Sequence, residues 1–147
     1  MNGAVSRSLS VLLVDDAPTD LLLAQEVFGD HAPTVQLRTA CGAQVAFAHL
    51  RDGSLPLPDL VLVDVNMAGM DGFEFLTQLR ATPELAHLPV IMLSGSEAQH
   101  DVDRAYDLQA TAFLVKALSL GDFMAQVEHI VKFWQGCRFR TARVPVS

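Results

Sequence analysis

The sequence predicts an α/β protein built on a doubly wound parallel sheet. Five short apolar runs alternate along the chain with segments of helical apolar spacing, an order typical of strands joined by crossover helices. The run LVLV at residues 60–63 is unbroken, as in strands that are covered on both faces. Acid, hydroxyl or amine side chains follow four of the five runs directly. Together these observations predict a buried sheet with a polar rim.

The first half of the chain is predicted to contain two strands and two helices. Strands are expected over 9–16 and 35–40, and helices over 18–28 and 43–50. Pro18 suits the first turn of a helix and Gly29 suits a position just after its end.

The second half continues the alternation with three strands and three helices. Strands are expected over 60–63, 90–93 and 112–115, and helices over 72–82, 97–108 and 120–134. The inner face of the helix over 97–108 is predicted to consist of Ala98, Val102, Ala105 and Tyr106. The last helix has the clearest pattern. Its apolar positions are Leu120, Phe123, Met124, Val127, Ile130, Val131 and Trp134.

A (βα)5 chain of this kind fits the flavodoxin-like strand order 2-1-3-4-5, in which the first and third strands are neighbours. The carboxyl ends of parallel strands then meet at one rim of the sheet. The order therefore predicts one cluster of polar side chains, namely Asp15, Asp16, Asp64, Ser94 and Lys116. Each could be a turn residue alone, or the cluster could be a set of salt bridges that only closes a sheet edge.

Length and composition indicate one globular domain over 1–147, with a core at about 9–134. Half of the residues are apolar, and no apolar run approaches the roughly 20 residues that span a bilayer. We expect a cytoplasmic protein that does not act at a membrane, in which Cys41 and Cys137 are free thiols.

The charge distribution bears on partners. The net charge of −7 speaks against non-specific binding of nucleic acid. The end of the chain is nevertheless basic, with Lys132, Arg138, Arg140 and Arg143 and no acid after them. A basic tail over 135–147 is either a solvated end or a docking or dimer contact.

The polar cluster suits phosphoryl transfer. Three carboxylates at one point repel each other unless a cation joins them, and Mg²⁺ is the hard divalent ion that prefers such oxygen ligands. An aspartate nucleophile, a metal and a lysine can together form and stabilise an acyl phosphate. The Ser94 hydroxyl can hydrogen-bond an anionic oxygen.

The same residues carry a resemblance to a known family. The paired acids Asp15-Asp16, the loop DVNMAGMDG over 64–72, the pair Ser94-Gly95 and Lys116 occur in this order, with Phe113 three residues before the lysine. From about residue 9 to 134, the chain resembles the receiver domain of two-component response regulators.

The resemblance implies a role for each acidic residue. Asp64 would accept a phosphoryl group from a histidine of a sensor histidine kinase. Asp16, Asp64 and the backbone carbonyl of Asn66 would bind Mg²⁺ directly, and Asp15 largely through water. The expected protein is a signalling phosphoacceptor rather than an enzyme.

The resemblance also implies a switch. Ser94 and Lys116 would hold the phosphoryl oxygens, and Phe113 would turn inward when Ser94 moves toward the phosphate. The output face would comprise the helix over 97–108, the strand over 112–115 and the helix over 120–134. Without the family, Phe113 is simply a half-buried core aromatic.

Two residues depart from the family pattern. The family usually has proline after the lysine, in a cis peptide, where this chain has Ala117, so we expect a trans bond and a reshaped loop. Ala68 likewise stands where a proline is usual, a replacement that we expect to loosen the loop slightly.

A narrower resemblance is to single-domain regulators paired with bacterial phytochrome-type histidine kinases. It rests on the segment from Ala105-Tyr106-Asp107-Leu108 to Phe133-Trp134 with a short tail. We expect a stand-alone receiver, and a homodimer through the output face and the C-terminal end. The alternative for Trp134 is that it only covers the core.

Two other functions remain open from the sequence. A haloacid-dehalogenase-like phosphohydrolase uses similar chemistry, but it would need an acid at Asn66 and would place its paired acids last. The second alternative is a receiver-like interaction module that is never phosphorylated.

Overall fold

The computed structural model describes residues 8–29 and 34–137, and it shows a five-stranded parallel sheet in the order β2-β1-β3-β4-β5. The strands are β1 (Leu9–Asp15), β2 (Val35–Cys41), β3 (Leu60–Asp64), β4 (Val90–Ser94) and β5 (Ala112–Val115). The helices are α1 (Pro18–Gly29), α2 (Ala43–Arg51), α3 (Gly72–Ala81), α4 (Gln99–Asp107) and α5 (Leu120–Gly136). The predicted fold class and strand order are confirmed.

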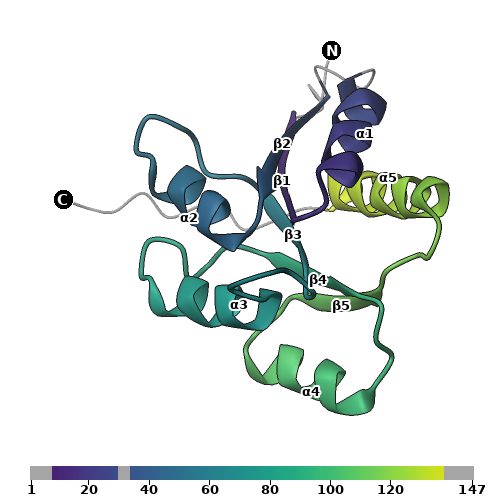
Figure 1. Ribbon diagram of the computed structural model, residues 1–147. Coiled ribbons are helices and arrows are strands. Elements are labelled where there is room, and N and C mark those ends of the chain that lie inside the picture. Colours follow the sequence, from purple (N-terminus) through teal and green to yellow (C-terminus); the bar gives the residue numbers. More distant parts are fainter. Residues whose placement is uncertain (1–7, 30–33, 138–147) are drawn as a thin grey trace.

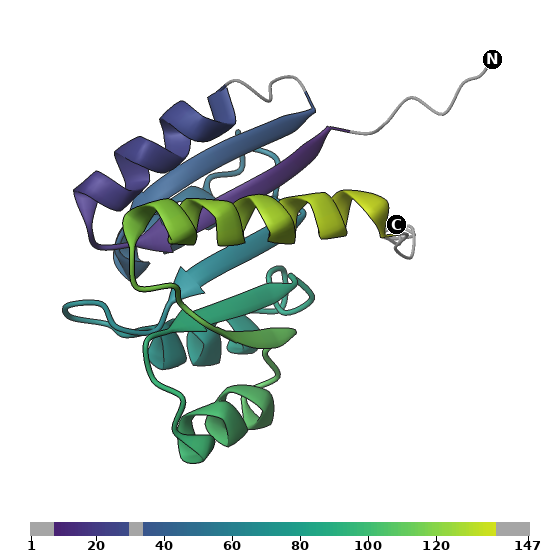
Figure 2. The same ribbon diagram turned by 90° about the vertical axis from the view of Figure 1, so that its right-hand side faces the viewer.

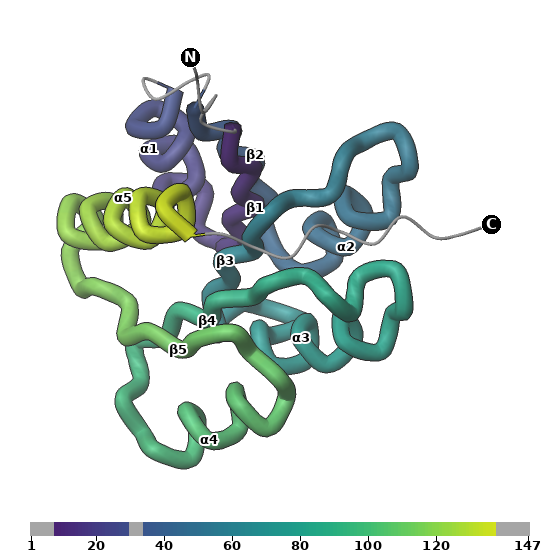
Figure 3. Tube along the Cα trace, turned by 180° about the vertical axis from the view of Figure 1, so that it is seen from behind, coloured from purple at the N-terminus to yellow at the C-terminus, as the bar shows by residue number. Residues whose placement is uncertain are grey.

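Helices cover both faces of the sheet. Figure 1 shows α1 and α5 on one side and α2 and α3 on the other, with α4 beside β5 at the edge of the sheet. The view from behind in Figure 3 shows the same division, and in Figure 2 α5 lies across the near face of the sheet beside α1. Both faces of the central strands are therefore removed from water.

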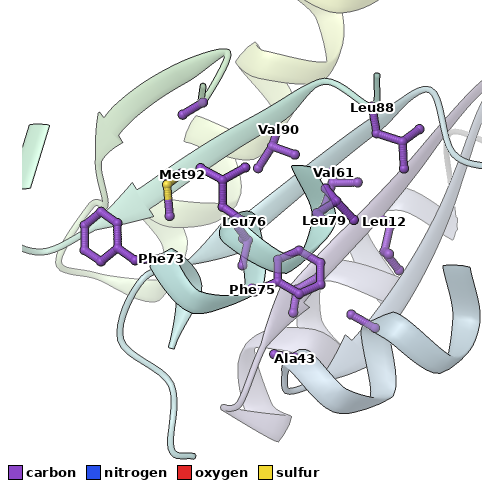
Figure 4. Close-up of a cluster of buried hydrophobic side chains, with 14 of the residues drawn as sticks. Leu12, Ala43, Val61, Phe73, Phe75, Leu76, Leu79, Leu88, Val90 and Met92 are labelled. Atoms are coloured by element: carbon purple, nitrogen blue, oxygen red, sulfur yellow. The ribbon is translucent and has the colours of Figure 1, made fainter. Parts of the chain in front are cut away.

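The alternation of side chains along each strand divides the core into two clusters. Leu12, Val61 and Met92 face α2 and α3, where they pack with Phe75 and other aromatic and aliphatic side chains (Figure 4). Leu13 and Leu62 face the opposite way, toward α1 and α5. The unbroken apolar runs of the sequence are explained by this burial on both sides.

The last helix follows its predicted pattern closely. Six of its seven predicted inner residues are buried, Trp134 among them with 8% of its surface exposed, and Leu120 is partly buried. Trp134 therefore packs on the core, as in the alternative considered for it. Its neighbour Phe133 is 70% exposed.

The prediction for the inner face of α4 was wrong at Tyr106. Ala105 is fully buried, but Tyr106 is 50% exposed. The Tyr106 hydroxyl accepts a hydrogen bond from the Phe113 N–H at 3.3 Å, so the side chain reaches across to β5 rather than into the core. A short helix with one fully buried residue has a narrower inner face than the spacing suggested.

Two further predictions concern the chain ends and the membrane. Most of the basic tail lies outside the described residues, which end at Cys137. Within the part of the chain that the structure describes, no helix is long and apolar enough to cross a bilayer.

Candidate functional site

The two central strands bring Asp15 and Asp64 together. Each is the last residue of its strand, and β1 and β3 are paired up to Val14 opposite Val63. Both carboxylates are largely buried, with 1% of Asp15 and 8% of Asp64 exposed. The apolar strands before them fix the position of their backbones within the sheet.

The Lys116 ammonium joins these carboxylates. Its Nζ atom lies 3.0 Å from Asp15 Oδ2 and 3.0 Å from Asp64 Oδ2. The ammonium also lies 4.6 Å from the centre of the Phe123 ring, a cation–π contact with a buried residue of α5. The lysine thus bridges the two strand ends across a separation of 101 residues from Asp15 in the sequence.

A third carboxylate, from Asp20, contacts the same ammonium at 3.2 Å. Asp20 lies in the first turn of α1. The sequence analysis missed it, because an acid in the first turn of a helix is common for reasons of helix stability alone. The signal that could have found it is its position one turn after Asp16, on a helix that starts at the polar rim.

Burial and charge act on this cluster in opposite directions. Burial raises the pKa of Asp15, and the Ala17 N–H and Lys116 offset only part of that rise. Burial lowers the pKa of Lys116, but the hydrogen bonds and charges of Asp15 and Asp64 outweigh it, so that the pKa stands above its ordinary value. Lys116 therefore stays a cation at any physiological pH.

Asp16 lies at the rim beside the pair but is bound differently. Its Oδ2 atom accepts a hydrogen bond from the Ala68 N–H at 2.8 Å, across the loop that follows β3. Proline at position 68 could not donate this bond, because it has no N–H. The expectation of a looser loop overlooked this donor, which ties the loop to Asp16.

The loop after β3 is fixed at both ends. Asp64 Oδ1 accepts from the Asn66 N–H at 3.0 Å. Asp71 caps α3 by accepting from the Glu74 N–H at 2.9 Å. A Cβ atom at Gly72 would lie 2.8 Å from the Asp64 carbonyl oxygen and 2.8 Å from Val65 Cα, so only glycine permits this close approach of α3 to the end of β3.

Ser94 and Phe113 lie near the cluster without joining it. Ser94 ends β4 and is 1% exposed, and its Oγ accepts from the Ser96 N–H at 3.0 Å. In the part of the chain that the structure describes, the Ser94 hydroxyl makes no hydrogen bond to the carboxylates or to the Lys116 ammonium; Ser94 binds Lys116 only through the backbone, where its carbonyl accepts from the Lys116 N–H at 2.7 Å. Phe113 is partly buried against the cluster that contains Met92, a position that fits the simple core reading as well as the switch reading.

An open cavity of about 510 Å³ lies beside the acidic cluster. Its lining includes Asn66, Ser94, Ser96 and Arg104, with the Arg104 guanidinium 4.3 Å from the centre of the Phe73 ring. Asp64 itself is not part of the lining, but the two residues that follow it, Val65 and Asn66, are.

The donor atoms at the rim suit a hard divalent cation, although they do not yet surround one point. Among the residues that the structure describes, no three His, Cys, Asp or Glu side chains are arranged to enclose a metal ion. Existing contacts explain this: the Lys116 ammonium pairs with the Asp15 and Asp64 carboxylates, and the Asp16 carboxylate accepts a hydrogen bond from the Ala68 N–H. The oxygen donors fit Mg²⁺ if Lys116 shares its two carboxylates with the cation.

Known proteins resemble this chain both in sequence and in fold. The response regulator Rcp1 of Synechocystis sp. is 32% identical over 128 residues, which cover 84% of this chain and 87% of Rcp1. Its Mn²⁺-bound crystal form has a TM-score of 0.78 at 30% identity, covering 91% of this chain and 99% of that one.

Two further solved structures are similar. The phosphorylated cyanobacterial phytochrome response regulator RcpA has a TM-score of 0.79 at 29% identity, covering 88% of this chain and 95% of RcpA. RPA3017, a response regulator in red light signalling of R. palustris, has a TM-score of 0.72 at 29% identity, and the match covers 95% of this chain and 99% of RPA3017. Residues 11–128 also match the family described as the response regulator receiver domain. By fold, site geometry and sequence match, this chain belongs to the response regulator receiver family of two-component signalling.

Proposed function

We propose that this chain is a single receiver domain that accepts a phosphoryl group on Asp64 from a sensor histidine kinase. The observation that carries the proposal is the ammonium of Lys116, 3.0 Å from Asp64 Oδ2 and 3.0 Å from Asp15 Oδ2 at the end of two buried strands. A cation fixed beside an aspartate nucleophile is what an incoming, negatively charged phosphoryl group requires.

The transfer proceeds by displacement at phosphorus. One carboxylate oxygen of Asp64 forms the new O–P bond while the N–P bond to the kinase histidine breaks, and the electron pair of that bond leaves with the imidazole. Lys116 stabilises the charge on the phosphoryl oxygens, and Ser94 reaches them with its hydroxyl. Asp15, Asp16, Asp64 and the Asn66 carbonyl would hold Mg²⁺, which supplies further neutralisation of that charge.

The acyl phosphate then acts as a switch. It adds about −1.5 to −2 charges and new acceptor oxygens beside Lys116 and Ser94, which favours the arrangement in which both close on it. Phe113 lies on β5, three residues before Lys116, and its N–H binds the Tyr106 hydroxyl of α4. A shift of β5 therefore changes the face made by α4, β5 and α5. That face is the proposed output surface.

The direct test is labelling of Asp64. The purified protein, incubated with acetyl phosphate and Mg²⁺, should gain one phosphoryl group by intact-mass measurement, and Asp64→Asn should gain none. Asp107→Asn, which changes an exposed acid of α4, is the matched control and should be labelled normally. Labelling of another residue in Asp64→Asn would refute the assignment, and absence of labelling in the unchanged protein would favour a receiver-like module that is not phosphorylated.

The kinase is proposed to be of the phytochrome type, because RcpA and RPA3017 are named for phytochrome and red-light signalling. Phosphotransfer from a purified phytochrome-type kinase should be faster than from a chemotaxis kinase at equal concentrations. Equal rates would remove the support for this pairing. Steady turnover of a phosphate ester, the phosphohydrolase alternative, is not expected for a member of this family.

We also propose that a second copy of the chain binds to the output face and to the end of α5. Exposed apolar side chains support this contact: Tyr106, Val115 and Leu118 near β5, and Phe133 on α5, with Leu118 fully exposed and Phe133 70% exposed. Leu118→Ser and Phe133→Ser should each lower the dimer fraction in light-scattering measurements, whereas Leu22→Ser, an exposed apolar position of α1, should not. A monomer at all concentrations would contradict the proposal.

A further inference from the structure

Lys116 stands at the end of β5, which has a neighbouring strand on one side only. Its N–H donates to the Ser94 carbonyl of β4 at 2.7 Å, so one side of the backbone is anchored in the sheet. On the other side, the sheet formed by the described residues has no strand that could bind the backbone groups flanking the lysine. A catalytic lysine on a strand edge therefore needs another partner to fix its backbone.

That partner is the side chain of Gln126 on α5. Gln126 Nε2 donates to the Val115 carbonyl at 2.8 Å, and Gln126 Oε1 accepts from the Ala117 N–H at 3.1 Å. One carboxamide thus binds the residue before Lys116 and the residue after it, as a peptide group of a neighbouring strand would. Only an amide offers a donor and an acceptor side by side in this way.

The same helix also supports the lysine side chain. Phe123, one turn before Gln126, lies under the ammonium at 4.6 Å and is 1% exposed. The start of α5 is fixed by Ser119, whose hydroxyl accepts from the Asp122 N–H at 3.1 Å. Two residues of one helix therefore hold Lys116, the buried Phe123 through the ammonium and the partly buried Gln126 through the backbone.

We infer that Gln126 is a positioning residue for Lys116, and that its two hydrogen bonds to Val115 and Ala117 fix the lysine for phosphoryl transfer. One of these bonds depends on alanine at position 117, because the proline that is usual there in the family has no N–H to donate. The catalytic part of the inference rests on the proposed function at Asp64. The positioning of Lys116 by Gln126 does not depend on the proposed function.

The expected consequence is kinetic. Loss of the carboxamide lets the segment around Lys116 move, and misplacement of a catalytic group by a fraction of an ångström to one ångström slows a reaction by about 10-fold to 100-fold. Gln126→Ala should therefore slow phosphorylation of Asp64 by acetyl phosphate by about 10-fold. Gln126→Glu keeps the length but turns an acceptor toward the Val115 carbonyl, so it should not restore the rate.

The matched control is Gln135→Ala. Gln135 lies on the same helix and also donates to a backbone carbonyl, that of Thr34 at 3.2 Å, but at the far end from Lys116. This variant should be phosphorylated as fast as the unchanged protein. Ala117→Pro removes the N–H, so Gln126→Ala should slow the reaction less in that background than in the unchanged one. Equal rates for Gln126→Ala and Gln135→Ala, with the unchanged protein labelled, would overturn the inference.

A second measurement separates this inference from the proposed function. Amide exchange followed by NMR in the unphosphorylated protein should show a slow Ala117 N–H, accelerated about 10-fold or more in Gln126→Ala but not in Gln135→Ala. If the unchanged protein is not labelled at all, the proposed function fails, and the positioning is then judged by this exchange and by the Lys116 side-chain ¹⁵N signal. No change of either signal in Gln126→Ala would overturn it.

Discussion

The acidic half of the site and the lysine half are held by different means. Asp15 and Asp64 end strands that have neighbours on both sides and are buried along their whole length apart from Ser10. Lys116 follows the edge strand β5, in which three residues are partly buried and Val115 is exposed. The sheet itself fixes the acids, whereas side chains from two helices hold the backbone of β5 and of the lysine segment. Tyr106 binds the Phe113 N–H, and Gln126 binds Val115 and Ala117.

This difference in anchoring predicts which half of the site moves more easily. Backbone in the middle of a packed sheet has no second arrangement of similar energy, whereas an edge strand held by a few polar side chains can change partners at a small cost. We therefore expect the mobile element on the lysine side, which is also the proposed output face.

The largest expected effect tests the burial on which the comparison rests. Leu62 of β3 and Leu114 of β5 pack in the same cluster, but Leu62 is fully buried and Leu114 only partly. Leu62→Ala should lower the free energy of unfolding by about 3–4 kcal/mol, and Leu114→Ala by about 1–2 kcal/mol. Urea unfolding of both variants measures the difference. Equal losses would show that β5 is as firmly packed as the centre.

A smaller effect is expected where the two halves are joined. Arg80 at the end of α3 donates to the Ala86 and Leu88 carbonyls before β4 and, through Nε and Nη2, to the Gln109 carbonyl before β5. Arg80→Met should cost about 2–3 kcal/mol of unfolding free energy, because three backbone carbonyls, of which those of Ala86 and Leu88 are in partly buried hydrogen bonds, lose charged donors. Arg51→Met, at the exposed end of α2, should change it little and serves as the control.

The next prediction concerns pH and the Lys116 contacts, in the absence of added metal. Lys116→Met should cost about 1–2 kcal/mol near neutral pH, since Asp15 and Asp64 lose a partly buried partner. The pKa of Lys116 is raised in the folded protein, so its contribution is complete below the ordinary lysine value of 10.5 and is lost as the pH rises through the folded pKa. The difference between the two proteins should therefore shrink in urea unfolding at alkaline pH. A constant difference would contradict the ion-pair account.

The smallest effect is expected at the outer edge of β5. Tyr106→Phe removes only the hydroxyl that accepts from the Phe113 N–H, so the unfolding free energy should fall by about 0.5–1 kcal/mol. Amide exchange of Phe113 should accelerate, while exchange of residues in β3 stays unchanged. Unchanged exchange at Phe113 would mean that the edge of β5 is held by packing rather than by this bond.

Much of the fold was predictable because its signals are local. Each apolar run marks a strand, and Gly29 and Gly72 stand where helices end and begin. Pairing of residues far apart followed from one topological rule, the order 2-1-3-4-5, which brought Asp15, Asp64 and Lys116 to one rim. The carboxylate and lysine positions were therefore accessible from the sequence.

The remaining contacts were not predictable, because they depend on register between elements. Nothing near Gln126 in the sequence shows that one turn of α5 will face the end of β5. The contacts of Asp20 and Tyr106 were not predictable for the same reason. Each residue fits an ordinary helix position, and only the packing of the helix on the sheet decides its partner. The proposed roles of Ser94 and Phe113 in switching stay predictions.

The contact between Gly72 and the end of β3 has a mechanical consequence. The first residue of α3 packs directly against the Asp64 carbonyl, so the carboxyl end of β3 has no free space on that side. Ser94 and Ser96, at the end of β4 and just after it, line the open cavity, so we expect this segment rather than the backbone of β3 to adjust when a group is added to the Asp64 side chain. We therefore expect Gly72, which has no chemical function of its own, to limit how far the end of β3 can shift.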